Sequence, residues 1–136
     1  MRTLLRSLVM TCAIVSAAAA AAEVYLADAI KSPTYAQALT KLLKSAGHLP
    51  DWTHGLLNRR GDYVGTPVVH VTVAGTRYEL FHACKAHDCA DNRIEVMFAP
   101  HGTRAWGAIV IDGKDAAYLG GPNPAQQSAL KAAVQP

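Results

Sequence analysis

The chain has 136 residues, of which 51% are hydrophobic and 17% charged, and its formal net charge is +3. This composition is that of a globular protein and excludes a disordered tail, a coiled coil and a collagen-like rod. The length favours one domain, because two domains would each be too small to close a core comfortably.

The first 22 residues have the pattern of a secretory signal peptide. Arg2 and Arg6 precede a largely apolar run over residues 8–22 that ends in alanines, so we expect cleavage after Ala22 and a single domain over 23–136. The run is too short for a membrane-spanning helix, which needs about 20 residues. We therefore expect a periplasmic protein with no membrane anchor after cleavage.

Cleavage also changes the charge balance. Removing 22 residues from 136 leaves 114, and loss of Arg2 and Arg6 leaves 11 basic residues against 10 acidic ones, a net charge of about +1. A chain so close to neutral lacks the basic surface that binding to phosphate backbones requires. We expect no nucleic-acid partner.

The first part of the remaining chain predicts an amphipathic helix. Residues 24–30 fit either a strand or a helical turn. Ser32 and Pro33 are typical of the N-cap and the first helical position. Leucines then recur at helical spacing until Gly47, which is expected to end a helix that lies on a sheet.

The next segment predicts a connection and then a series of antiparallel strands. Residues 49–52 form a tight connection anchored by Trp52, and residues 53–67 are expected to be mainly loop. The predicted strands are residues 68–73, 77–83, 93–98, 104–111 and 116–119.

A last helix is expected over 124–134. Its packing residues would be Ala125, Leu130, Ala133 and Val134. A helix, then strands, then a helix predict an α+β fold, with a central antiparallel β-sheet of about five strands flanked by helices.

No catalytic motif is present in the sequence. There is no Gly-rich phosphate loop, no nucleophile elbow and no His-Glu-x-x-His, and the acidic residues are scattered rather than paired. We expect a protein that is not an enzyme and that has no cofactor.

The unusual segment is residues 82–89, which contains His82, Cys84, His87 and Cys89. In an oxidising compartment, two cysteines separated by four residues are expected to form a disulfide. That disulfide would either close a plain surface turn or stiffen a loop that presents His87 to a partner. The alternative is a metal-binding or redox module that uses these side chains, although structural zinc sites usually take their ligands from two separated segments.

A presented loop would have a defined chemistry. So short a ring contributes only roughly 2 kcal/mol to the folding stability through loop entropy. It also stiffens residues 85–88, which lowers the entropy that the loop loses when it docks on a partner. A protonated imidazole at His87 offers two N–H donors, which suits a cleft with two carboxylates such as that of a glycosidase. Lys85 would reach an acidic rim, and Asp88 would orient the ring or cap backbone N–H groups of the loop.

Residues in this segment carry a family resemblance. Cys84-Lys85-Ala86-His87-Asp88-Cys89, followed by Arg93-Ile94 and Val96-Met97-Phe98, resembles the Ivy family of inhibitors of vertebrate lysozyme, whose loop reads Cys-Lys-Pro-His-Asp-Cys. Leu49-Pro50 with Trp52 resembles the family's Leu-Pro-x-Trp after its first helix. Tyr118-Leu119-Gly120 with Pro122 resembles the ending of its shorter members.

The resemblance implies a periplasmic inhibitor of C-type lysozyme that lodges this loop in the active-site cleft. His87 would lie against the catalytic carboxylates, supported by Lys85 and Asp88. The resemblance also implies a possible homodimer and, as an alternative target, the lytic transglycosylases of the bacterium itself. Ala86 replaces the family's proline, and we expect it to loosen the loop by about 0.4–1 kcal/mol and to weaken binding.

Overall fold

A computed structural model describes residues 18–58 and 60–136 of the chain. Most of the predicted signal peptide therefore lies outside the described residues. Residues 18–22 are exposed and have no regular secondary structure. In the described part of the chain, no helix is long and apolar enough to cross a membrane.

The first predicted helix is confirmed. Helix α2 (Pro33–Ser45) has Ser32 as its N-cap residue and Pro33 at its first position, and Gly47 follows its end with a φ of 73°. The segment before it forms a helical turn, α1 (Leu26–Ala29), rather than a strand.

The expectation that residues 53–67 are mainly loop is wrong. This stretch contains the end of the 3-10 helix η1 (Asp51–His54), the short helix α3 (Gly55–Asn58) and strand β1 (Tyr63–Gly65). Its local sequence lacks periodicity, but Leu56 is completely buried in the core and β1 pairs with a longer strand. Tertiary contacts, rather than local propensity, therefore determine its structure.

The sheet has six strands instead of about five, because β1 was not predicted. The others are β2 (Val69–Val73), β3 (Thr76–Lys85), β4 (Arg93–Phe98), β5 (Ala105–Val110) and β6 (Ala117–Leu119). The order is β1-β3-β4-β5-β6, with β2 also paired to β3, and every pairing is antiparallel. The long strand β3 thus pairs with β2 along its first half and with β1 at its end.

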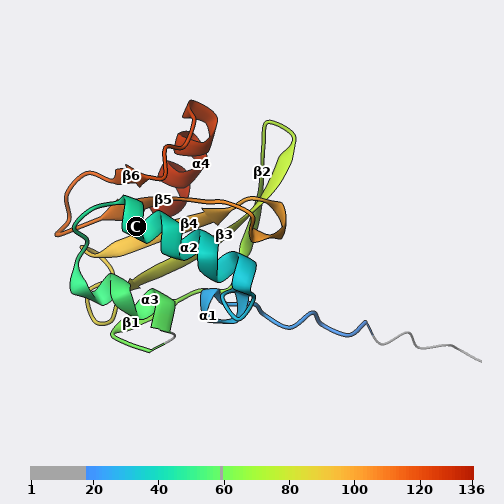
Figure 1. The fold of residues 1–136 in the computed structure, drawn as a ribbon, viewed down its shortest axis with the longest axis horizontal. Helices are drawn as coiled ribbons and strands as arrows, with labels where there is room; N and C mark the ends of the chain where they lie inside the picture. Colours follow the sequence, from blue (N-terminus) through green and yellow to red (C-terminus); the bar gives the residue numbers. More distant parts are fainter. Residues whose placement is uncertain (1–17, 59) are drawn as a thin grey trace, which may run out of the picture.

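Helices cover both faces of this sheet (Figure 1). Helix α2 lies on one face and α4 (Pro124–Val134) on the other. Strands β4 and β5 are buried along their whole length because both of their faces are covered. The predicted α+β class is therefore confirmed.

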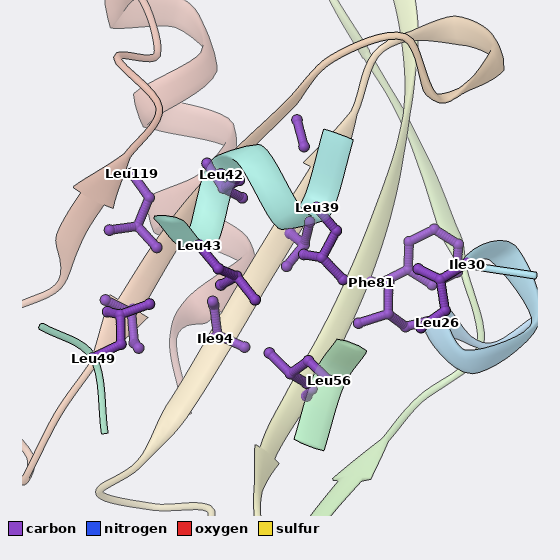
Figure 2. Close-up of a cluster of buried hydrophobic side chains, with 14 of the residues drawn as sticks. Leu26, Ile30, Leu39, Leu42, Leu43, Leu49, Leu56, Phe81, Ile94 and Leu119 are labelled. Atoms are coloured by element: carbon purple, nitrogen blue, oxygen red, sulfur yellow. The ribbon is translucent and has the colours of Figure 1, made fainter. Parts of the chain in front are cut away.

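The main core lies between α2 and the sheet. Figure 2 shows Leu39 and Leu43 of α2 directed toward the strand residues Phe81 and Ile94. A second, smaller cluster lies under α4 and contains Leu80, Met97, Ala108, Val110, Leu130, Val134 and Trp106.

Two expectations about packing have different outcomes. Trp52 is a buried anchor, as predicted, with 8% of its surface exposed, and Trp106 is buried as well, with 7% exposed. Ala125, which we expected to pack, is exposed, and Gln126 is buried in its place. Gln126 is the third residue of α4 and completes the capping box with Asn123, which turns its side chain inward.

Candidate functional site

The segment 84–89 joins β3 to β4 and is shorter as a loop than predicted. Cys84 and Lys85 belong to β3, because Cys84 pairs with Arg93 of β4 and Lys85 pairs with Tyr63 of β1. The strand predicted over residues 77–83 therefore continues two residues further than expected. The true loop begins at Ala86.

A tight turn places His87 at the tip of this loop. The N–H of Asp88 donates to the carbonyl oxygen of Lys85 at 3.0 Å, and His87, but not Ala86, has a positive φ, of 64°. This is the arrangement of a type II turn with His87 at its third position. The side chain of His87 is exposed.

A disulfide between Cys84 and Cys89 closes the ring, with an S–S distance of 2.01 Å. Cys84 is buried, with 4% of its surface exposed, whereas Cys89 is exposed. The bond therefore ties the exposed return of the loop to a sulfur fixed in the core. Disulfide sulfurs are not available as thiolate ligands.

This disulfide removes both thiolates that the metal-binding alternative requires, whereas the redox alternative stays a prediction. The Nδ1 of His82 lies 3.1 Å from Glu95 Oε2, so that only the Nε2 of this ring could bind a metal ion. In the ranges that the structure describes, no group of three or more His, Cys, Asp and Glu side chains is placed to hold a metal ion.

The two charged residues of the loop contact each other. Lys85 Nζ lies 3.5 Å from Asp88 Oδ2, and the same oxygen accepts a hydrogen bond from Asn92 Nδ2 at 2.8 Å. The carboxylate of Asp88 thus holds the loop together from within. We expected this carboxylate to orient the ring of His87 or to cap backbone N–H groups of the loop. Within the described chain it bonds to neither.

The start of the loop, at Ala86, is also bound to a distant segment. The N–H of Ala86 donates to the carbonyl oxygen of Asp62 at 2.6 Å, just before β1. A proline at this position has no N–H and could not make the bond. The expectation that Ala86 simply loosens the loop is therefore incomplete, because alanine allows a contact that the family residue excludes.

An open hollow of about 870 Å³ adjoins the start of the loop. Its lining includes Trp52, Arg60, Asp62 and Lys85, which come from three separate segments. Lys85, which we expected to reach an acidic rim, thus shares one concave surface beside the loop with Arg60. Arg59 lies outside the described residues.

Arg93 fixes the end of the loop that leads into β4. Its side chain is buried, with 8% of the residue exposed, and its guanidinium donates to the carbonyl oxygens of Ala90 and Val134. Val134 is the last residue of α4, where a cation is favoured by the helix dipole. The guanidinium therefore connects the end of the loop to the end of α4.

Sequence reasoning missed a hydrogen bond between His82 and the buried carboxyl group of Glu95, on the α4 face of the sheet. Glu95 has 4% of its surface exposed and accepts a hydrogen bond from His82. Burial raises the pKa of Glu95, and the hydrogen bond from His82 partly opposes that rise. The only available signal was that polar residues alternate with apolar ones in both strands, which predicts a shared face but not burial.

Two comparisons with known proteins bear on this site. The profile of the family described as inhibitor of vertebrate lysozyme (Ivy) matches residues 34–134. An uncharacterized protein of Yersinia pestis is 28% identical over 122 residues, which cover 81% of this chain and 76% of that relative. The matched residues 34–134 include the whole sheet and the disulfide loop.

Proposed function

Because the chain belongs to the Ivy family of inhibitors of vertebrate lysozyme, we propose that it inhibits C-type lysozyme with its disulfide loop. The loop over residues 84–89 enters the active-site cleft of the enzyme and occludes it. The protein itself catalyses no reaction in this mechanism, since inhibition requires only that the loop occupy the place of the substrate.

The observation that carries the proposal is the conformation of His87. It is an exposed residue with a side chain at a positive φ, where glycine or asparagine would be less strained. The disulfide and the contacts of Ala86 and Arg93 hold the turn that imposes this conformation. A backbone that surrounding contacts hold in a strained conformation at an exposed position favours a role in binding.

The chemistry of the imidazole fits the proposed target. A glycosidase of the retaining type has two carboxyl groups about 5–5.5 Å apart. A protonated imidazole between them donates one N–H to each, and both hydrogen bonds are charge-assisted. Because the loop is already ordered in the free protein, docking costs little conformational entropy.

The location and the target follow from the same proposal. An inhibitor of peptidoglycan-cleaving enzymes acts in the periplasm, to which the predicted signal peptide would direct this chain. The lytic transglycosylases of the bacterium itself are the alternative target, since they cut the same glycan strands. A homodimer stays a prediction from the family resemblance.

The test is a titration of purified C-type lysozyme with the wild-type protein, His87→Ala and His101→Ala. His101 is a matched control, because it is also an exposed histidine with a positive φ, of 62°, in the 3-10 helix η2 (Pro100–Gly102). We expect His87→Ala to raise the inhibition constant about a hundredfold, as the loss of charge-assisted hydrogen bonds implies, and His101→Ala to leave it unchanged.

Equal inhibition by the wild type and His87→Ala would remove His87 from the mechanism. A wild-type protein that leaves C-type lysozyme fully active but inhibits a lytic transglycosylase would transfer the proposal to the alternative target. Inhibition of neither enzyme would contradict the proposed function.

A further inference from the structure

Asn92 lies between the disulfide loop and β4 and is almost completely buried, with 5% of its surface exposed. Buried asparagine is unfavourable unless its amide finds partners. The backbone and the side chain of Asn92 together make four hydrogen bonds, and all four involve the loop or the segment packed behind it.

The backbone of Asn92 contacts both ends of the tight turn. Its carbonyl oxygen accepts from the N–H of Lys85 at 2.9 Å, and its own N–H donates to the carbonyl oxygen of Asp88 at 3.0 Å. Lys85 and Asp88 are the first and last residues of the turn that carries His87. Asn92 thus sets the distance between Lys85 and Asp88, the two ends of the turn.

The side chain of Asn92 connects the same turn to a different part of the sheet. Its Nδ2 donates to Asp88 Oδ2 at 2.8 Å, and its Oδ1 accepts from the N–H of Asp112 at 3.2 Å. Asp112 lies in the connection between β5 and β6. The neighbouring Gly113 N–H donates to the carbonyl oxygen of Asp91 at 2.9 Å, so this connection is bound to the loop twice.

We infer that Asn92 is the positioning residue of the inhibitory loop: through Asp88 it determines where His87 stands relative to the sheet. This inference rests on the proposed function. Only a carboxamide of this length offers both a donor for Asp88 and an acceptor for Asp112. Aspartate lacks the donor, and alanine lacks both groups.

The test uses Asn92→Asp, which keeps the acceptor for Asp112 but places a second carboxylate against Asp88. We expect the inhibition constant for C-type lysozyme to rise about tenfold, because one hydrogen bond is lost and two like charges face each other. In the double variant Asp88→Asn, Asn92→Asp, the donor and the acceptor exchange places. That variant is expected to inhibit several-fold better than Asn92→Asp alone.

Asn123→Ala is the control for a general loss of stability. Asn123 caps α4 through its hydrogen bond to Gln126, so its replacement lowers the melting temperature without contacting the loop. We expect its inhibition constant to match the wild type. Equal inhibition by the wild type and Asn92→Asp, or no recovery in the double variant, would overturn the inference.

Amide hydrogen exchange separates this inference from the proposed function. In Asn92→Asp, the N–H groups of Lys85 and Asp88, which close the turn, are expected to exchange at least several-fold faster than in the wild type, whereas the N–H of Asp112 keeps its acceptor. If the wild type inhibits no enzyme, the proposed function fails, and this exchange alone decides whether Asn92 positions the loop. Unchanged exchange at Lys85 and Asp88 would overturn the inference.

Discussion

The two ends of strand β3 are closed in different ways. At its start, β3 joins β2 through the two residues Ala74 and Gly75, which both have positive φ values, of 47° and 81°. At its other end, β3 leads into the disulfide loop (Figure 1). In the described chain, Ala74 and Gly75 make no hydrogen bond to a segment outside their hairpin, whereas the loop is bound to three other segments.

The difference shows what a positive φ means in each place. The hairpin needs a type I′ turn, whose twist matches that of its strands and which requires a positive φ at both central residues. Gly75 is one of these two residues, and glycine adopts a positive φ without steric strain. The loop instead holds His87 in the left-handed region, although a glycine there would form the same turn more easily. The hairpin turn is thus determined by local geometry, and the loop is determined by contacts that only a folded chain provides.

The largest effect is expected when the disulfide is removed. Replacing both Cys84 and Cys89 by alanine should lower the free energy of unfolding by about 2 kcal/mol, the loop-entropy value for a ring of this size. Inhibition should also weaken more than tenfold, because the exposed return of the loop is no longer tied to the core. Urea unfolding and an inhibition titration measure the two quantities.

Gly75→Ala is the matched change at the hairpin. A Cβ added to Gly75 would meet no atom within 4 Å, so its cost of about 1 kcal/mol comes from the backbone alone. We expect stability to fall and inhibition to stay unchanged. If inhibition instead falls in proportion to stability in both variants, the two ends of β3 do not differ in function.

A smaller effect is expected for Ala86→Pro. Proline would restrict the unfolded chain by about 0.4–1 kcal/mol, but it would abolish the bond from the Ala86 N–H to Asp62, which is worth about 0.5–1.5 kcal/mol. We therefore expect stability to change by less than about 0.5 kcal/mol and inhibition not to improve. A tenfold tighter complex would show that loop stiffness outweighs the bond to Asp62.

Much of the fold could be predicted from the sequence because its signals are local. Helix α4 and strand β4 have the predicted bounds, since Pro124 begins the helix and the strand lies between clear turns. Strand β1 could not be predicted. It has three residues, includes Gly65, and exists because β3 offers it a pairing edge.

The candidate site also has features that could be predicted from the sequence and features that could not. The disulfide and the exposed position of His87 follow from spacing and composition alone. The contacts that hold the loop do not, because Asp62, Asp112 and Val134 are each about twenty or more residues away from their partners. No periodicity in the sequence indicates which distant carbonyl or N–H will meet a loop.

The smallest effect is expected in the middle of β3, where His82 contacts Glu95. Burial raises the pKa of Glu95 above its ordinary value of 4.5, so the folded protein binds this proton more tightly than the unfolded chain does. The stability that comes from the protonated carboxyl is complete below pH 4.5 and is lost as the pH rises through the folded-state pKa. Glu95→Gln does not titrate, so the wild type should gain stability relative to the variant as the pH falls from 7 toward 4.5.

Urea unfolding at a series of pH values measures this difference, and repeating it with His82→Gln in both proteins removes the contribution of His82. A difference that changes in the opposite direction would mean that the hydrogen bond from His82 outweighs burial. Inhibition by Glu95→Gln should equal that of the wild type at neutral pH, because Glu95 is directed toward α4 and contacts neither end of β3. A change in stability at the centre of the strand would then leave the loop in place, which is expected only if the loop is held by its own contacts.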